Sequence, residues 1–265
     1  LSSVVAKSLG LYALNDLGVS EFWMPALVGA LAFPLLCFMG WMMPKFLAPP
    51  QADIAARTKR VTLAGHHRWR LFVKFMPLLV ILFGANLLLT VQRDIKEDFI
   101  VCIIDVSQVS SWAFAYLDSI ATVVLLGAFA LLSAVGNHLR ALCLILIFSA
   151  IGMGTVAFLG AEGEALDIPT TAWLFLQTFC IDIAYLSFQT IFFERFIACF
   201  KVKGNVGFFI ITIDFIGYLG TLCLLLFKEF QAPHIDWTSF YNAMSVYIGI
   251  ACCLAFAGSI VYIIN

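Results

Sequence analysis

Residues 170–197 read TTAWLFLQTFCIDIAYLSFQTIFFERFI, a long apolar run with the acid Asp182 near its middle. About 20 consecutive apolar residues cross the hydrocarbon core of a bilayer as a helix, so this stretch predicts a transmembrane helix. Comparable runs lie at about residues 2–17, 22–43, 71–92, 110–134, 139–160, 170–197, 203–228 and 238–263. The sequence therefore predicts an all-α polytopic membrane protein with about eight transmembrane helices.

The composition supports this class. Of the 265 residues, 63% are hydrophobic and 12% are charged, whereas soluble domains are about 45–50% apolar and 25% charged. The apolar runs are continuous, which excludes a β-barrel, because barrel strands alternate over segments of about ten residues. The formal net charge of −1 gives no reason to expect nucleic acid as a partner, and the lipid bilayer is the expected one.

One loop, residues 44–70, is rich in basic residues. Against the single acid Asp53, this loop contains Lys45, Arg57, Lys59, Arg60, Arg68 and Arg70. Loops rich in Lys and Arg stay in the cytoplasm, and the alternation of helices from this loop then places the C-terminus in the cytoplasm as well. The loop divides the chain into residues 1–43, with two helices, and residues 71–265, with six.

Six helices after a cytoplasmic linker are the layout of the second half of a major facilitator transporter. The two helices before the linker then correspond to the end of the first half. On this interpretation the chain holds helices 5–12 of a 12-helix, major-facilitator-like bundle, and about four N-terminal helices of the same protein precede Leu1.

Asp182 and Asp214 are the main functional candidates, because a carboxylate deep in an apolar helix is costly and usually faces the protein interior or a water-filled path. Tyr185 and Gln189 follow Asp182 at i+3 and i+7, and Tyr218 follows Asp214 at i+4, so each acid heads a polar stripe. Two interpretations stay open. Either these residues form a pathway for a substrate or protons, or Asp214 is hydrogen-bonded across a helix interface that nearby glycines allow. No deep Lys or Arg is evident as a partner.

A second candidate is an ion pair near the predicted outer surface. Asp118 lies about 10 Å inside the outer end of its helix, and Arg93 follows the run 71–92 at a similar level. We expect Arg93 and Asp118 to pair, either as an outer gate or as a static clamp.

Motifs for other functions are missing from the sequence. It contains no HExxH, GxSxG, P-loop or strand-linked GxGxxG pattern, so no enzymatic activity and no cofactor are expected. His66 and His67 are adjacent but have no acid or thiol at ligand spacing, so no metal site is expected either.

Three stretches resemble a known family. They are Val19 to Pro25 (VSEFWMP), Arg57 to Arg60 (RTKR), and Gly204 to Gly220, which contains GNVG and DFIGYLG. The chain resembles the bacterial inner-membrane proteins catalogued as domain of unknown function 5690, which look distantly like major facilitator transporters. The resemblance implies a bacterial inner-membrane location and a transporter-like fold, but it supplies no site residues. Residues 136–140 (GNHLR) depart from the superfamily's signature loop, since they lack its acidic and repeated basic residues.

The expected function is secondary transport of a small polar or charged solute, coupled to protons, by alternating access. Asp182 and Asp214 would bind protons or the solute, and Tyr185, Gln189 and Tyr218 would orient it. The alternative is a membrane scaffold or sensor that has a transporter-like fold but does not transport, and a lipid-modifying enzyme is a third, weaker interpretation.

Overall fold

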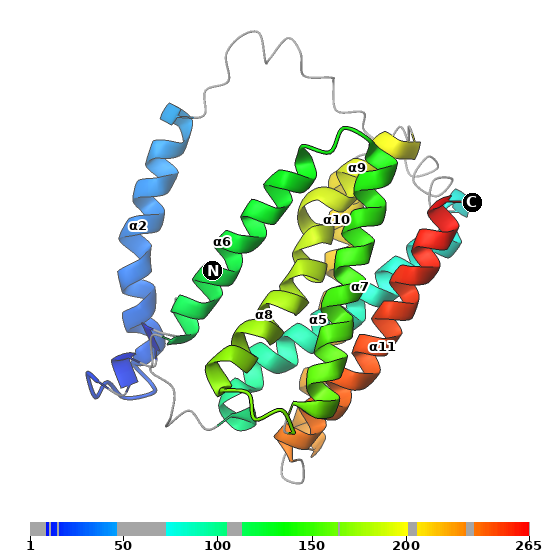
Figure 1. Cartoon of the computed structure of the whole chain (residues 1–265). Coiled ribbons are helices and arrows are strands. Elements are labelled where there is room, and N and C mark those ends of the chain that lie inside the picture. Colours follow the sequence, from blue (N-terminus) through cyan, green and yellow to red (C-terminus); the bar gives the residue numbers. More distant parts are fainter. Residues whose placement is uncertain are drawn as a thin grey trace. The chain divides into compact units, whose positions relative to one another are not determined.

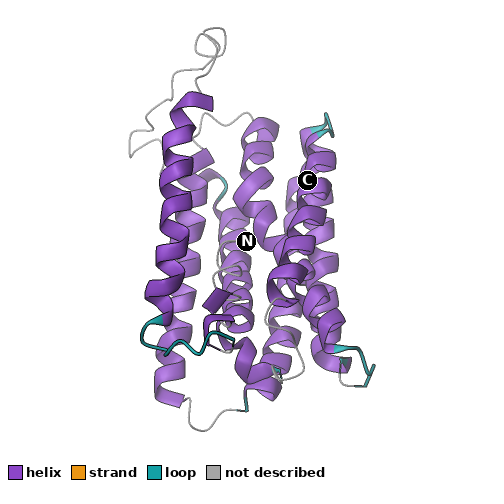
Figure 2. Cartoon of the chain, turned by 90° about the vertical axis from the view of Figure 1, so that its left-hand side faces the viewer, coloured by secondary structure: helices purple, strands orange, loops and turns teal. Residues whose placement is uncertain are grey.

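The computed structural model describes residues 9–10, 12–14, 16–46, 73–104, 113–163, 165–200, 206–231 and 236–264. In this part of the chain every regular element is a helix (Figure 2). The helices, shown in Figure 1, are α2 (Met24–Phe46), α5 (Met76–Ile103), α6 (Ala113–Ser133), α7 (His138–Glu162), α8 (Thr170–Ser187), the π-helix η2 (Phe188–Phe192), α9 (Phe193–Phe200), α10 (Val206–Gln231) and α11 (Trp237–Ile264). The predicted all-α class is confirmed.

Seven helices in the described residues are long and apolar enough to cross a membrane. They correspond to seven of the eight predicted runs. Of the remaining run, 2–17, residues 9–10 and 12–14 are helical and residues 1–8 lie outside the described part. The basic linker is also outside it from residue 47 onward, so the predicted division of the chain around this linker stays a prediction.

The chain forms two compact units, residues 1–60 with 110–119, and residues 61–109 with 120–265. Helix α2 belongs to the first unit, and α5, α7, α8, α9, α10 and α11 belong to the second. The second unit contains most of the predicted functional residues.

Helix α5 differs most from its predicted bounds. It begins at Met76 with Pro77 in its first turn, where the missing N–H of proline costs no helical hydrogen bond. It then continues to Ile103, although the prediction ended it at residue 92. The predicted end was wrong because Arg93, Asp94, Lys96 and Glu97 have partners within the second unit and need no aqueous loop.

Glycines set the contact between α7 and α11, which lie side by side in Figure 1. A Cβ atom on Gly249 of α11 would lie 2.7 Å from the backbone oxygen of Met153 and 2.7 Å from the Cβ of Ala157. A Cβ on Gly160 of α7 would lie 2.7 Å from the backbone oxygen of Asn242. Without side chains at these positions the two helices approach closely, as is common in membrane bundles.

The predicted helix 170–197 is α8, η2 and α9 in continuous succession. Phe188 and Phe192 of the π-helix are fully buried, as is Phe196 of α9. Phe193 stacks on Phe209 of α10, with ring centroids 5.3 Å apart. Phe196 also contacts Phe209, with ring centroids 5.9 Å apart, so these aromatic contacts join α9 to α10.

The surface of the second unit is apolar. Leu131, Ile211 and Phe230 are 75%, 71% and 79% exposed, and soluble monomers rarely expose large contiguous apolar patches. With the seven long apolar helices, this surface is compatible with an integral membrane protein.

Candidate functional site

Polar side chains within the spans of three helices form the candidate site, which we call the polar band. It consists of Arg93, Asp94 and Glu97 on α5, Asp182 and Tyr185 on α8, Gln189 on η2, and Asp214 and Thr221 on α10. The members are joined by the contacts described below.

Arg93 is the centre of the first group in the band. Its Nε lies 2.9 Å from Glu97 Oε1, one helical turn along α5, and 4.0 Å from Asp182 Oδ1 on α8. Its guanidinium carbon lies 4.7 Å from the ring centroid of Tyr185, within the range of a cation–π contact. The expectation that Asp182 has no deep base as a partner is therefore wrong. Arg93 reaches it because α5 continues past residue 92.

The predicted partner of Arg93 was Asp118, which belongs to the first unit. The ion pair to Glu97 and the approach to Asp182 already engage Arg93 within the second unit. The Arg93–Asp118 gate stays a prediction.

The second group joins η2 to α10, because the Gln189 side-chain amide donates a hydrogen bond to the Asp214 carboxylate. The sequence placed these residues on separate stripes, and the structure brings them together. Gln189 lies in the π-helix, a rare element that often marks functional sites. Among the described residues, no base lies within ion-pair distance of Asp214. Its partner is a neutral amide, which leaves the charge of an ionised carboxylate uncompensated.

The third group joins α5 to α10. The Thr221 hydroxyl donates a hydrogen bond to Asp94. One turn away, a Cβ on Gly217 would lie 2.8 Å from Thr90 Oγ1. Gly217 therefore allows the close helix approach that the interface interpretation expected, and Asp214 is hydrogen-bonded across helices as that interpretation also expected. The geometry thus satisfies the interface interpretation and leaves the functional one open.

Tyr218 differs from the other predicted pathway residues. Its side chain is 71% exposed, and it therefore lies at the edge of the band. Tyr185 still lies close enough to Tyr218 and Asp214 to interact with both electrostatically. The predicted residues of the two stripes therefore occupy one region.

The band extends over several turns of its helices. Ile103 at the end of α5 and Thr170 at the start of α8 line one pocket, so these two helix ends lie at the same level. At 1.5 Å per residue, Glu97 lies about 9 Å from that level, Asp182 about 18 Å and Gln189 about 28 Å. The hydrocarbon core is about 30 Å thick. The length of the band, from about 9 to 28 Å along the helices, is thus more than half of this thickness.

A second set of polar residues is fully packed between α5, α8 and α11. Lys96, only 5% exposed, donates a hydrogen bond of 2.7 Å to the Thr178 hydroxyl. Gln92 donates to Ser245 Oγ at 2.7 Å, and the Tyr241 hydroxyl donates to Gln177 Oε1 at 3.1 Å.

The sequence analysis did not identify Gln92, Lys96, Tyr241 or Ser245 as candidates. The signal that could have found them is the apolar period Ile95, Phe99 and Ile103, all buried, which continues the helix past the charges.

Carboxylates predominate in the band. It holds the four acids Asp94, Glu97, Asp182 and Asp214 against one base, Arg93, with Lys96 nearby along α5. In the described residues, no group of three or more His, Cys, Asp or Glu side chains is arranged to hold a metal ion. An acid-rich path favours protons or cations over anions.

One protein family matches the whole chain. The matching model is described as a family of unknown function (DUF5690) and covers residues 1–265. No curated protein and no solved structure matches the chain. The chain therefore belongs to the DUF5690 family, as the resemblance of its motifs indicated.

Proposed function

We propose that the protein is a secondary transporter of a small polar or charged solute, coupled to protons, and that it works by alternating access. The observation that supports this most is the polar band, which extends over about 9–28 Å of depth within apolar spans. Ionisable residues at such depth are rare in membrane helices and commonly mark ion or substrate paths.

Each residue of the band has a role in this proposal. Asp214 is the proton carrier, because among the described residues a neutral amide, that of Gln189, is the partner of its carboxylate. Arg93 lies near both Glu97 and Asp182. A proton or solute that binds Asp182 therefore changes how strongly Arg93 is attracted to each of these two carboxylates. Tyr185 orients Arg93 through its ring.

The exposed position of Tyr218 suits first contact with the solute. The expected Arg93–Asp118 pair would close the path on the outer side.

The proposal includes a major-facilitator-like layout with 12 helices, of which this chain supplies the last eight. This layout requires that the natural gene encode about four further transmembrane helices before Leu1. Reading the upstream sequence checks this expectation. An upstream region with no further apolar runs of about 20 residues would contradict the layout.

Proton movement tests the proposed function. The full-length protein is reconstituted in vesicles that contain a pH-sensitive dye, and a panel of amino acids, sugars, organic acids and organic cations is added in turn. We expect at least one class to cause proton flux. Asp214→Asn should lower this flux by at least about tenfold, because the amide cannot carry the proton. Asp98→Asn, an exposed acid on α5 outside the band, is the matched control and should leave the flux unchanged.

Two outcomes contradict the proposal. One is folded natural protein that moves no protons with any class of solute. The other is flux that survives Asp214→Asn while the amount of folded protein falls, which would make Asp214 a structural residue and favour a scaffold.

A further inference from the structure

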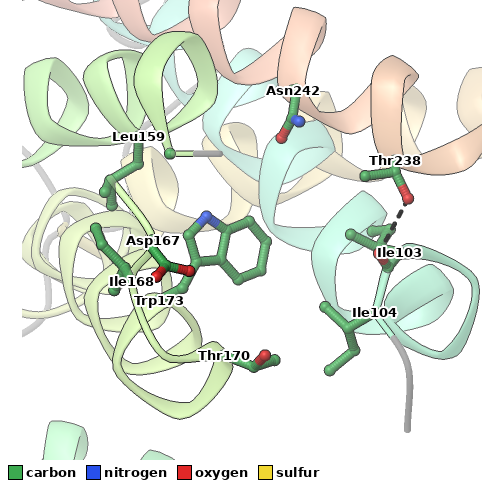
Figure 3. Close-up of a pocket in the computed structure, with 10 residues that line it drawn as sticks. Ile103, Ile104, Leu159, Asp167, Ile168, Thr170, Trp173, Thr238 and Asn242 are labelled. Atoms are coloured by element: carbon green, nitrogen blue, oxygen red, sulfur yellow. Dashed lines mark hydrogen bonds between the residues drawn. The ribbon is translucent and has the colours of Figure 1, made fainter. Parts of the chain in front are cut away.

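A pocket of about 230 Å³ lies where four helices of the second unit end (Figure 3). Its walls come from the last turns of α5 and α7, the loop after α7, and the first turns of α8 and α11. Typical ligand sites measure about 300–1,000 Å³, so an occupant of this pocket is small. The pocket lies beyond the polar band, near the level of Ile103 and Thr170.

The lining has one formal charge. Asp167 is the only ionisable side chain among the residues that line the pocket, and no Lys or Arg accompanies it. Two helix amino ends, which favour anions, and two helix carboxyl ends, which favour cations, meet here, so their dipoles largely offset each other. The Asp167 carboxylate therefore sets the sign of the field, and this sign favours a cation.

The position of Asp167 is fixed by an uncommon backbone conformation. Its φ of +48° lies in the left-handed region, which Asp tolerates better than most residues. The turn that follows α7 thus directs an acid to the pocket wall. Figure 3 shows the carboxylate among the labelled lining residues, with the Trp173 ring at their centre.

Trp173 supplies an aromatic surface. Its indole meets the buried ring of Tyr241 edge to face, with centroids 5.6 Å apart, and this contact fixes the indole plane. Tyr241 in turn donates a hydrogen bond to Gln177, one turn along α8 from Trp173. An indole and a carboxylate that line one pocket are a combination that can recognise a substituted ammonium group.

Polar groups on the remaining wall suit a short hydroxylated tail. Thr170, Thr238 and Asn242 line the pocket, and the Thr238 hydroxyl donates a hydrogen bond of 3.0 Å to the backbone oxygen of Ile103. That bond fixes the direction of the Thr238 hydroxyl and leaves its oxygen able to accept a second hydrogen bond.

We propose that this pocket binds a small organic cation of the alkylammonium class, with its ammonium group between the Asp167 carboxylate and the Trp173 indole. This binding does not depend on transport, so it can be tested separately from the proposed function. The carboxylate excess of the polar band below the pocket agrees with a cation.

The test is calorimetric titration of the full-length protein in lipid nanodiscs with choline. Its neutral carbon isostere, 3,3-dimethylbutan-1-ol, has the same shape without the charge and serves as the matched ligand. We expect choline to bind and the neutral isostere to bind at least about tenfold more weakly, because both the charge pair and the cation–π contact require a cation.

Variants locate the site. Asp167→Asn and Trp173→Leu should each weaken choline binding by about tenfold or more, whereas Trp173→Phe should retain part of it. The control is Asp236→Asn, since Asp236 is an exposed acid near the start of α11 that does not line the pocket. Asp236 caps α11 by accepting a hydrogen bond from the Thr238 backbone N–H. Asn is as good a helix cap as Asp, so this control should bind choline like the natural protein.

Equal binding of choline and its isostere, no binding of choline, or equal loss in Asp167→Asn and Asp236→Asn would each overturn the proposal. The comparison of the two ligands uses the natural protein, so it stands even where a variant fails to fold.

Discussion

Replacing Arg93 by glutamine is expected to lower the free energy of unfolding by about 2–3 kcal/mol. The substitution removes the base that lies 2.9 Å from Glu97 and 4.0 Å from Asp182, so both carboxylates lose the attraction of its positive charge. Fully buried pairs lose about 3–5 kcal/mol in this way. We expect less, because the Arg93 side chain is 25% exposed. Thermal unfolding in nanodiscs measures the change.

A second substitution separates charge from packing. Adding Glu97→Gln to Arg93→Gln removes the negative charge nearest to the lost base, and we expect it to restore more than half of the lost stability. Arg140→Gln, an exposed base at the start of α7, is the control and should change stability by less than about 0.5 kcal/mol. A natural level of stability in Arg93→Gln, or no recovery in the double variant, would show that the positive charge of Arg93 does not stabilise the carboxylates of the polar band.

Gly249→Ala is expected to separate α7 from α11 and to lower the free energy of unfolding by about 2 kcal/mol. The added Cβ would lie 2.7 Å from a backbone oxygen, that of Met153, and 2.7 Å from the Cβ of Ala157. A backbone oxygen cannot rotate away, so the helices must shift. The fraction of folded protein recovered by size-exclusion chromatography and its unfolding temperature measure the effect.

The same helix offers a matched control for this change. A Cβ on Gly258 of α11 has nothing within 4 Å, and Ala favours a helix over Gly by about 1 kcal/mol. Gly258→Ala should therefore leave stability equal or slightly higher. Adding Ala157→Gly to Gly249→Ala relieves one of the two clashes and should rescue part of the loss. Equal effects at both glycines would contradict the proposed role of the close α7–α11 contact.

The fold was predictable from the sequence where apolar runs end in polar turns. The runs 139–160 and 238–263 became α7 (His138–Glu162) and α11 (Trp237–Ile264) with small differences at their ends. The prediction failed at the end of α5, where charged residues looked like a loop. Charge alone does not end a membrane helix when the neighbouring helices supply partners, and those partners lie far along the chain.

The residues of the candidate site could largely be predicted from the sequence, but the contacts between them could not. Helical periodicity identified Asp182 and Asp214 with their stripes, because it shows which residues share a face. It does not show which face meets which helix. The packing of α5, α8 and α10 decides the Gln189–Asp214 bond, the approach of Arg93 to Asp182 and the burial of Lys96. The π-helix has no recognisable sequence signature.

In the proposed transporter, the polar band lines a path that is open to water from each side of the membrane in turn. Accessibility of single cysteines to a membrane-impermeant thiol reagent tests it most directly, in a variant in which the eight native cysteines are replaced. Thr221→Cys lies in the band, whereas Leu222→Cys, at the same depth on α10, replaces a side chain that is 52% exposed on the apolar surface. We predict that Thr221→Cys reacts with reagent added to either side and that Leu222→Cys reacts from neither. No reaction of Thr221→Cys, or reaction from one side only, would contradict alternating access.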